Sequence, residues 1–142
     1  FQSNADAYVK ALQSLDAWTK EQVATIPQAK RQVITSHDAF GYFAAQYRIT
    51  FLAPQGLNTE TEPSARQVAQ LIQQIRREKI RAVFLENMAN ARLIEQLSKD
   101  AGATVGERLY SDALSGADQP GATYLQMMRH NVTQLALGMQ RN

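Results

Sequence analysis

Short apolar segments alternate with helical patterns along most of this 142-residue chain, and the alternation restricts its fold more than any other feature. The apolar segments lie in RQVITS, ITFLAP, RAVFLEN and TVGERLYSDAL, at 31–36, 49–54, 81–87 and 104–114. Apolar residues at helical spacing predict helices at 39–47, after Ser64, at 91–100 and at 122–139. Connections of this length suit parallel strands. The sequence therefore predicts an α/β fold: a three-layer α/β/α domain with a four-stranded parallel sheet.

The first helical pattern, at 6–25, stands outside this alternation. Its apolar residues recur at roughly helical spacing, and Pro27 lies just beyond its end. The stretch FQSNA before it is similar to the remnant of a cleaved purification tag, so we expect residues 1–5 to lie outside the fold. The remaining chain has the size of one domain.

The composition excludes several classes of protein. The chain has 15 basic and 13 acidic residues, a net charge of +2, and no basic stripe interleaved with aromatic residues, so we expect no nucleic-acid partner. It has no cysteine, which excludes disulfides and thiolate metal sites. No apolar run approaches the roughly 18 residues that a membrane-spanning helix needs.

Three local signals predict where helices begin and end and where a strand is irregular. Ser64 and Gln67 form the S-x-x-Q pattern of a capping box at a helix start. Gly102 follows the helix at 91–100 and is expected to end it. Gly106 is a possible bulge in the fourth strand.

Polar side chains follow the strands at the edge where open α/β sheets bind ligands, beyond the carboxyl ends of the strands. His37 follows the first strand, and Asn58 lies in the loop after the second. Glu86 ends the third strand, and Asp112 follows the fourth. Neutral imidazole and carboxylate are good ligands for zinc, manganese or iron. The sequence therefore indicates a metal site at this edge.

Each of these residues also has a purely structural interpretation. His37 could be a hydrogen-bonded histidine near a helix N-terminus, where the helix dipole also favours an acid such as Asp38. Glu86 could pair with a neighbouring amide or cation, or support a metal ligand through a hydrogen bond. Asp112 could cap the turn after its strand. His130, the second histidine, faces away from the apolar stripe of the last helix and is expected to be a solvated surface residue.

The motifs of common enzymes are missing from the sequence. It contains no G-x-S-x-G elbow, no P-loop and no G-x-G-x-x-G. We therefore expect no catalytic activity. A small α/β enzyme that uses His37 as a base with Glu86 or Asp112 remains an alternative.

Three stretches of the chain resemble the metal-binding proteins of zinc and manganese ABC importers, periplasmic solute-binding proteins of the cluster that includes adhesin-like lipoproteins. They are VITSHDAFGYFAAQY, FLAPQGLNTETEPSARQVAQLIQQIRREKIRAVFLEN and LYSDALSGADQPGATYLQMMRHNV. The specific motifs are T-S-H-x-A-F-x-Y-F, N-T-E-x-E-P-S, F-x-E-N and Y-S-D-A-L. The resemblance runs from about Val33 to the end of the chain.

The resemblance implies two α/β lobes joined by one long rigid helix, with a metal ion held between the lobes. Each lobe supplies two ligands, and the two positions of the C-terminal lobe match His37 and Asp112, which requires the first and fourth strands to end side by side. Glu86 and Asn58 would support these ligands. Residues 6–27 would be the C-terminal part of the inter-lobe helix and 28–142 the C-terminal metal-binding lobe. The N-terminal lobe, a partner of this one, is absent from the sequence.

The resemblance also implies a function, which is to capture a divalent metal ion and deliver it to an ABC permease and its ATPase. An imidazole ligand favours Zn²⁺, with Mn²⁺ as the alternative, and half a site predicts weak or absent binding by this lobe alone. The implied location is the periplasm or the cell envelope, as a lipoprotein exported by a signal peptide. Arg48 departs from the family pattern, in which glycine is usual. A metal-independent adhesin or interaction module remains the alternative function.

Overall fold

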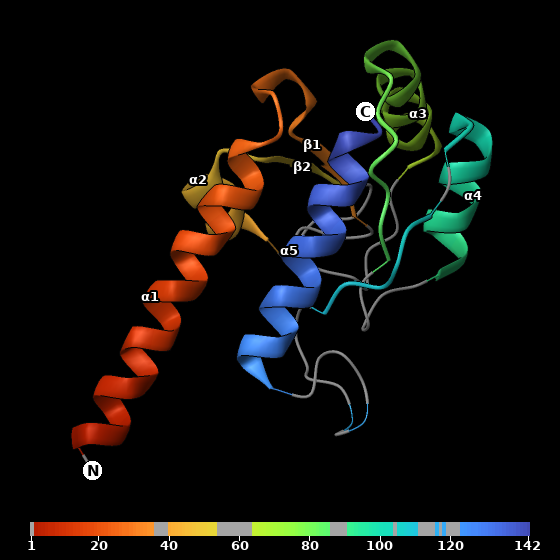
Figure 1. Ribbon diagram of the computed structural model, residues 1–142. Coiled ribbons are helices and arrows are strands. Elements are labelled where there is room, and N and C mark those ends of the chain that lie inside the picture. The colour runs from red at the N-terminus through yellow and green to blue at the C-terminus, as the bar shows by residue number, and fades with distance from the viewer. Residues whose placement is uncertain are drawn as a thin grey trace.

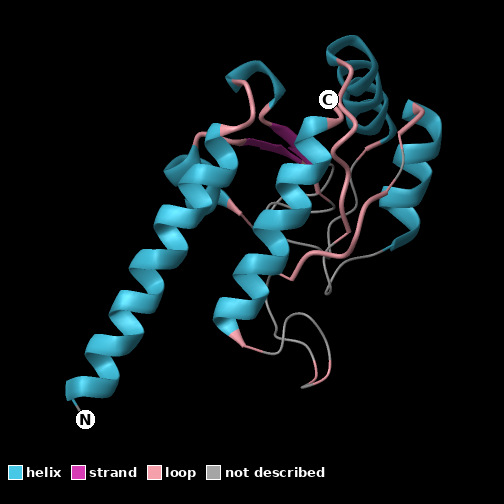
Figure 2. Ribbon diagram, viewed as in Figure 1, coloured by secondary structure: helices cyan, strands magenta, loops and turns pink. Residues whose placement is uncertain are grey.

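The structure, a computed structural model, describes residues 2–35, 40–53, 64–85, 91–103, 105–110, 116, 118 and 123–142. Among the described residues, helices alternate with two short strands as far as α3, and α4 and α5 follow (Figure 1; Figure 2). The elements are α1 (Gln2–Ala24), the 3-10 helix η1 (Gln28–Lys30), β1 (Gln32–Ile34), α2 (Gly41–Tyr47), β2 (Thr50–Leu52), α3 (Ala65–Glu78), α4 (Ala91–Ala101) and α5 (Tyr124–Gln140). The structure thus confirms the predicted α/β class.

The sheet is built from parallel segments. β1 and β2 pair in parallel, with Val33 opposite Phe51. Two isolated parallel bridges, Ile34 with Val83 and Val83 with Val105, continue the order. The order of the segments is therefore β2, β1, 82–85 and then 105–109.

One of our predictions about the sheet is not shown, and another needs correction. Within the described residues, β1 and β2 form a two-stranded sheet, and 82–85 and 105–109 join it through single bridges, so a four-stranded sheet is not shown. The first and fourth segments are not neighbours, because 82–85 lies between them and bonds to both. Parallel alignment nevertheless leaves the carboxyl ends of all the segments at one edge.

The two faces of the sheet pack against different helices. Successive side chains of a strand point to opposite faces, so Val33 and Phe84 contact a cluster with residues of α1 and α5. Ile34 and Val83 contact a cluster with residues of α3 and α4. Figure 1 shows these two helix pairs on either side of the β segments. This arrangement gives the predicted three layers.

The ends of α3 and α4 follow the local sequence signals. The Ser64 hydroxyl accepts from the Gln67 backbone N–H at 3.2 Å, and the Gln67 side chain accepts from the Ser64 backbone N–H at 2.9 Å. This confirms the capping box. Gly102 follows α4 with φ at 74°, and the backbone N–H of Ala103 bonds to the carbonyl of Ser98. The glycine therefore ends the helix as predicted.

The turn after α2 takes the left-handed backbone that an arginine disfavours. Arg48 has φ at 55° and ψ at 47°. The next residue, Ile49, is buried, and its N–H bonds to the carbonyl of Ala44 at 3.0 Å. The side chain of Gln28 donates to the Arg48 carbonyl at 3.0 Å. The buried isoleucine and these two bonds hold the arginine in a conformation that glycine would adopt without strain.

Helix α1 is longer than the sequence pattern predicted. It begins at Gln2 rather than at residue 6, and its N-terminal turns project away from the rest of the chain (Figure 1). Tyr8 and Val9 on these turns are each about half exposed. No helix among the described residues is long and apolar enough to cross a membrane.

Candidate metal centre

The four predicted site residues lie outside the described part of the chain. His37, Asn58, Glu86 and Asp112 all fall in the gaps between the described ranges. The described residues directly before and after them show how the fold holds each segment. Among the described residues, no three histidine, aspartate or glutamate side chains gather as a metal site would require.

The segment that carries His37 is held at both flanks by β2. Before it, Thr35 is fully buried, and its backbone N–H donates to the Leu52 carbonyl at 3.0 Å. After it, the ring of Phe40 stacks on the ring of Phe51, with centroids 5.2 Å apart. Only residues 36–39 separate these two attachments. The four residues 36–39, which include His37, therefore join two parts of the chain that both contact β2.

The segment 82–85, which precedes Glu86, lies between β1 and 105–109 in the sheet. Leu85 is buried, and its carbonyl accepts from the backbone N–H of Leu109 at 2.9 Å. Phe84, one residue earlier, donates its N–H to the Ile34 carbonyl at 2.9 Å. The chain before Glu86 thus connects the segment that leads to His37 with the one that leads to Asp112.

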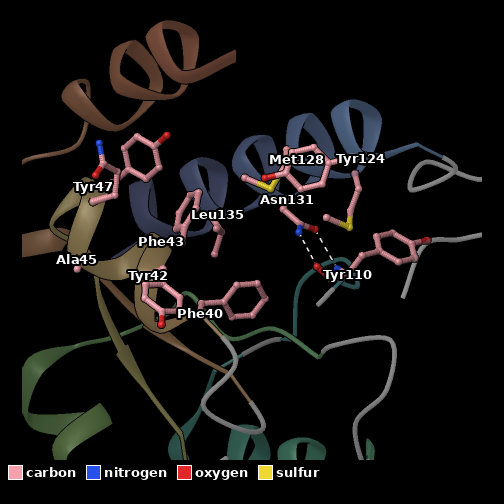
Figure 3. Close-up of a pocket in the computed structure, with 12 residues that line it drawn as sticks. Phe40, Tyr42, Phe43, Ala45, Tyr47, Tyr110, Tyr124, Met128, Asn131 and Leu135 are labelled. Carbon is pink, nitrogen blue, oxygen red and sulfur yellow. Dashed lines mark hydrogen bonds between the residues drawn. The ribbon is translucent and has the colours of Figure 1, made fainter. Parts of the chain in front are cut away.

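Helix α5 holds the end of the fourth segment through the side chain of Asn131. The amide oxygen of Asn131 accepts from the Tyr110 N–H at 2.9 Å, and its amide nitrogen donates to the Tyr110 carbonyl at 2.7 Å (Figure 3). Asn131 itself is 3% exposed. Both polar groups of the Tyr110 backbone are therefore bonded, two residues before Asp112.

Asn131 is a functional candidate that our sequence analysis missed. A signal was available, because Asn131 lies four residues from both Met127 and Leu135, on the buried stripe of α5. A polar residue on such a stripe is nearly always hydrogen-bonded. The partner, Tyr110, lies 21 positions away, which no local pattern reveals.

His130 was predicted to be a solvated surface residue, and this prediction is wrong in part. Its ring is half-buried, and Nε2 lies 2.7 Å from the carbonyl oxygen of Arg108. The ring also meets that of Tyr110 edge-on, with centroids 5.4 Å apart. The helical pattern placed His130 off the apolar stripe correctly, but it could not show that 108–110 crosses this side of α5.

Three of the parallel segments end at one edge of the sheet, and each is followed in the sequence by a predicted site residue. β1 leads to His37, 82–85 leads directly to Glu86, and 105–110 leads to Asp112. Neighbouring strands lie about 4.8 Å apart, so the first and fourth segments are separated by about 10 Å. The connections after these segments would have to bring His37 and Asp112 together over the end of 82–85.

An aromatic groove of about 710 Å³ opens between α2 and α5. Phe40, Phe43, Tyr110 and Tyr124 contribute to its lining (Figure 3). Tyr42, also at this groove, is 97% exposed. The groove is therefore an open aromatic surface beside the segment ends that lead to His37 and Asp112.

A hydrogen bond between Tyr47 and Asp16 connects α2 to α1. The Tyr47 hydroxyl donates to Asp16 Oδ1 at 2.7 Å. Burial, and then the hydrogen bond to the Asp16 carboxylate, raise the pKa of Tyr47 to about 12. The hydrogen bond from Tyr47, and then the contact with Lys20 at 3.0 Å, lower the pKa of Asp16 below 3.8. The helix that follows the His37 segment is thus bonded to the long helix α1.

Comparison with known proteins adds a family match over nearly the whole chain. Residues 1–138 match the family model described as zinc-uptake complex component A, periplasmic. The chain is 34% identical to the manganese-binding lipoprotein MntA of Bacillus subtilis over 145 aligned positions, which cover 99% of this chain and 47% of that protein. It is 35% identical over 138 positions to the iron-binding protein YfeA of Yersinia pestis, covering 97% of this chain and 44% of that protein.

The fold is also similar to solved structures. The periplasmic zinc-binding protein TroA of Treponema pallidum superposes with a TM-score of 0.91 at 30% identity, covering 98% of this chain and 52% of the TroA chain. A periplasmic metal-binding protein of Candidatus Liberibacter asiaticus gives a TM-score of 0.85 at 25% identity, covering 97% of this chain and 51% of that one. The chain therefore spans about half the length of the proteins that it matches, and the matched part is their C-terminal half.

Proposed function

Because this chain belongs to the zinc-uptake complex component A family, we propose that it is the C-terminal lobe of a solute-binding protein that captures a divalent transition metal for an ABC importer. One observation carries the proposal. The parallel segments that lead to His37, Glu86 and Asp112 end at one edge of the sheet, where α/β folds bind ligands.

In this proposal, His37 and Asp112 bind the metal ion through a ring nitrogen and a carboxylate oxygen. Imidazole and carboxylate suit zinc and manganese, and a nitrogen ligand favours zinc. Glu86 and Asn58 would orient these ligands through hydrogen bonds. The metal ion is cargo, so no residue needs to activate water, and we propose no enzymatic activity.

The same proposal assigns a role to α1. We propose that 6–27 is the C-terminal part of a helix joining two lobes, that 28–142 is the C-terminal lobe, and that an N-terminal lobe supplies further ligands. The exposed Tyr8 and Val9 support this assignment, because a second lobe beside α1 would cover them. The four parallel segments would then form one sheet in the lobe.

The proposed setting follows the relatives. MntA is called a lipoprotein and TroA is called periplasmic. We propose that the whole protein works in the periplasm or the cell envelope, after export by a signal peptide, and passes its metal ion to an ABC permease powered by an ATPase.

Calorimetric titration of the two-lobed protein with Zn²⁺ and with Mn²⁺ tests the proposed function. We expect one site per protein, and at least a hundredfold loss of affinity in His37→Ala and in Asp112→Ala. Asp118→Ala is the matched control, because Asp118 is an exposed carboxylate six positions after Asp112, and it should leave the affinity unchanged. Unchanged affinity in His37→Ala or Asp112→Ala contradicts the proposal. If the unaltered protein bound no metal ion, a metal-independent interaction module would be favoured.

The isolated 142-residue chain provides a second test. With two of its ligands absent it should bind Zn²⁺ only weakly, with a dissociation constant above roughly 1 µM, since each ligand contributes to the affinity of a site. Tight 1:1 binding by the monomeric chain would show that the site is complete without a second lobe.

A further inference from the structure

The side chain of Asn131 bonds to the backbone of Tyr110 as a neighbouring strand would, but for this one residue alone. Its amide bonds to both the N–H and the carbonyl of Tyr110, at 2.9 and 2.7 Å. One residue earlier, Leu109 is fully buried and bonds to the Leu85 carbonyl at 2.9 Å. The backbone hydrogen bond to the sheet therefore fixes Leu109, and the side chain of Asn131 fixes the next residue, Tyr110.

The side chain of Tyr110 lines the open aromatic groove between α2 and α5 and meets the ring of His130 edge-on, with centroids 5.4 Å apart. Packing at this open groove does not restrain Tyr110 as a closed core would. The adjacent His130 adds one bond, from Nε2 to the Arg108 carbonyl at 2.7 Å. A single turn of α5 thus fixes the backbone at 108 and 110 through side chains.

We infer that Asn131 is a positioning residue for metal binding, and that it acts by fixing the backbone from which Asp112 extends. The inference rests on the proposed function, since Asp112 must be a ligand for its position to matter. Only Ser111 separates Tyr110 from Asp112 in the sequence, so in this proposal the support of the Tyr110 backbone affects where the Asp112 carboxylate is held. A ligand that must be held closely to its productive position depends on such support.

Asn142 offers a matched control within the same chain. Its amide oxygen accepts from the N–H groups of Arg81 and Ala82 at 2.6 and 2.9 Å. Its amide nitrogen donates to the carbonyls of Lys30 and Gln32 at 2.8 and 2.7 Å. Asn142 therefore also joins backbone segments through both ends of an asparagine amide. It does so where β1 and 82–85 begin, at the edge opposite the proposed metal site.

The test compares Zn²⁺ and Mn²⁺ affinity in the two-lobed protein for Asn131→Ala, Asn131→Leu and Asn142→Ala, with the melting temperature of each metal-free variant. Asn131→Leu keeps the branched shape of the side chain and replaces its hydrogen-bonding atoms by methyl groups, so it remains informative if the alanine variant folds poorly. We expect both Asn131 variants to lose about 10- to 100-fold in affinity, the usual effect of removing support for a metal ligand. Asn142→Ala should lower the melting temperature and leave the affinity within about threefold.

A double-mutant cycle separates positioning from general destabilisation. If Asn131 acts through Asp112, then Asn131→Leu should cause no further loss of affinity in a chain that already carries Asp112→Ala. The inference is overturned if Asn131→Leu binds metal as the unaltered protein does, if Asn142→Ala loses as much affinity, or if the two losses add in full. When Asp112→Ala retains full affinity, both the proposed function and the inference fail. When Asp112→Ala loses affinity and Asn131→Leu does not, only the inference fails.

Discussion

Replacing Gly138 with alanine should destabilise this protein, although alanine is the better helix former. Gly138 lies in the last turns of α5, where the gain in helix propensity alone would be about 1 kcal/mol. A β-carbon at this position would lie 2.6 Å from Cζ and 2.9 Å from Cε2 of Phe84, and 3.3 Å from the β-carbon of Ala82. Carbon atoms normally pack at about 3.5–4.0 Å. The added methyl group therefore overlaps the ring.

The Phe84 ring cannot move away easily, because a second glycine lies against its other edge. A β-carbon at Gly106 would lie 2.8 Å from Cε1 of Phe84, so the ring fills the space between the backbones of α5 and the fourth segment. Overpacking of this kind costs about 1–3 kcal/mol, and a ring held on both sides places Gly138→Ala in the upper part of that range. Subtracting the propensity gain of about 1 kcal/mol leaves a net loss of about 1–2 kcal/mol.

Urea denaturation followed by circular dichroism measures this loss, which also corresponds to a melting temperature about 3–6 °C lower in a domain of this size. Gly41→Ala is the matched control, because nothing lies within 4 Å of a β-carbon at Gly41; it should be neutral or slightly stabilising. Phe84→Leu should relieve the overlap, so the double variant should be more stable than the sum of the single effects predicts, by about 1 kcal/mol. The reasoning is refuted if Gly138→Ala is as stable as Gly41→Ala.

Three further predictions concern the helices and their ends. Arg48→Gly should raise the free energy of unfolding by about 0.5–1 kcal/mol, because the gain from removing a left-handed backbone penalty of roughly 1–2 kcal/mol exceeds the glycine entropy cost of about 0.5–1 kcal/mol. A urea midpoint below that of the unaltered protein would contradict this prediction. Asp16→Asn should lower the pKa of Tyr47 from about 12 but keep it above 10.0, because burial is the larger cause, and ultraviolet titration of the phenol measures it. Folding raises the Tyr47 pKa, so the stability due to the Tyr47–Asp16 hydrogen bond is lost as the pH rises from 10.0 through about 12. Folding lowers the Asp16 pKa, so this stability is also lost as the pH falls below 3.8. Ser64→Ala should lower the free energy of unfolding by about 1 kcal/mol through loss of the cap on Gln67, and an unchanged urea midpoint would show that the cap contributes nothing.

Features encoded within a few residues could be predicted from the sequence. The capping box at Ser64 and the end of α4 at Gly102 depend only on residues three or four positions apart, and the structure confirms both. The alternation of apolar runs with helical patterns likewise gave the α/β class and the two helix layers. These signals are local because helices and strands satisfy their backbone groups in regular, short-range or periodic patterns.

Features that depend on which segments meet could not be predicted in this way. The order of the segments, with 82–85 between β1 and 105–109, leaves no trace in the periodicity of any one segment. The pairing of Asn131 with Tyr110 joins residues 21 positions apart. Gly106 leaves room for the ring of Phe84, because a β-carbon there would lie 2.8 Å from Cε1 of that ring, and no pattern around Gly106 reveals this contact. For each of these, the deciding partner lies elsewhere in the chain.

Anomalous diffraction from crystals of the two-lobed protein grown with Zn²⁺ tests the central claim most directly. The account predicts one strong zinc peak beyond the carboxyl ends of β1, 82–85 and 105–110, within about 2.0–2.2 Å of a His37 ring nitrogen and an Asp112 carboxylate oxygen. A fully occupied peak elsewhere, with His37 or Asp112 turned away from it, would contradict the account.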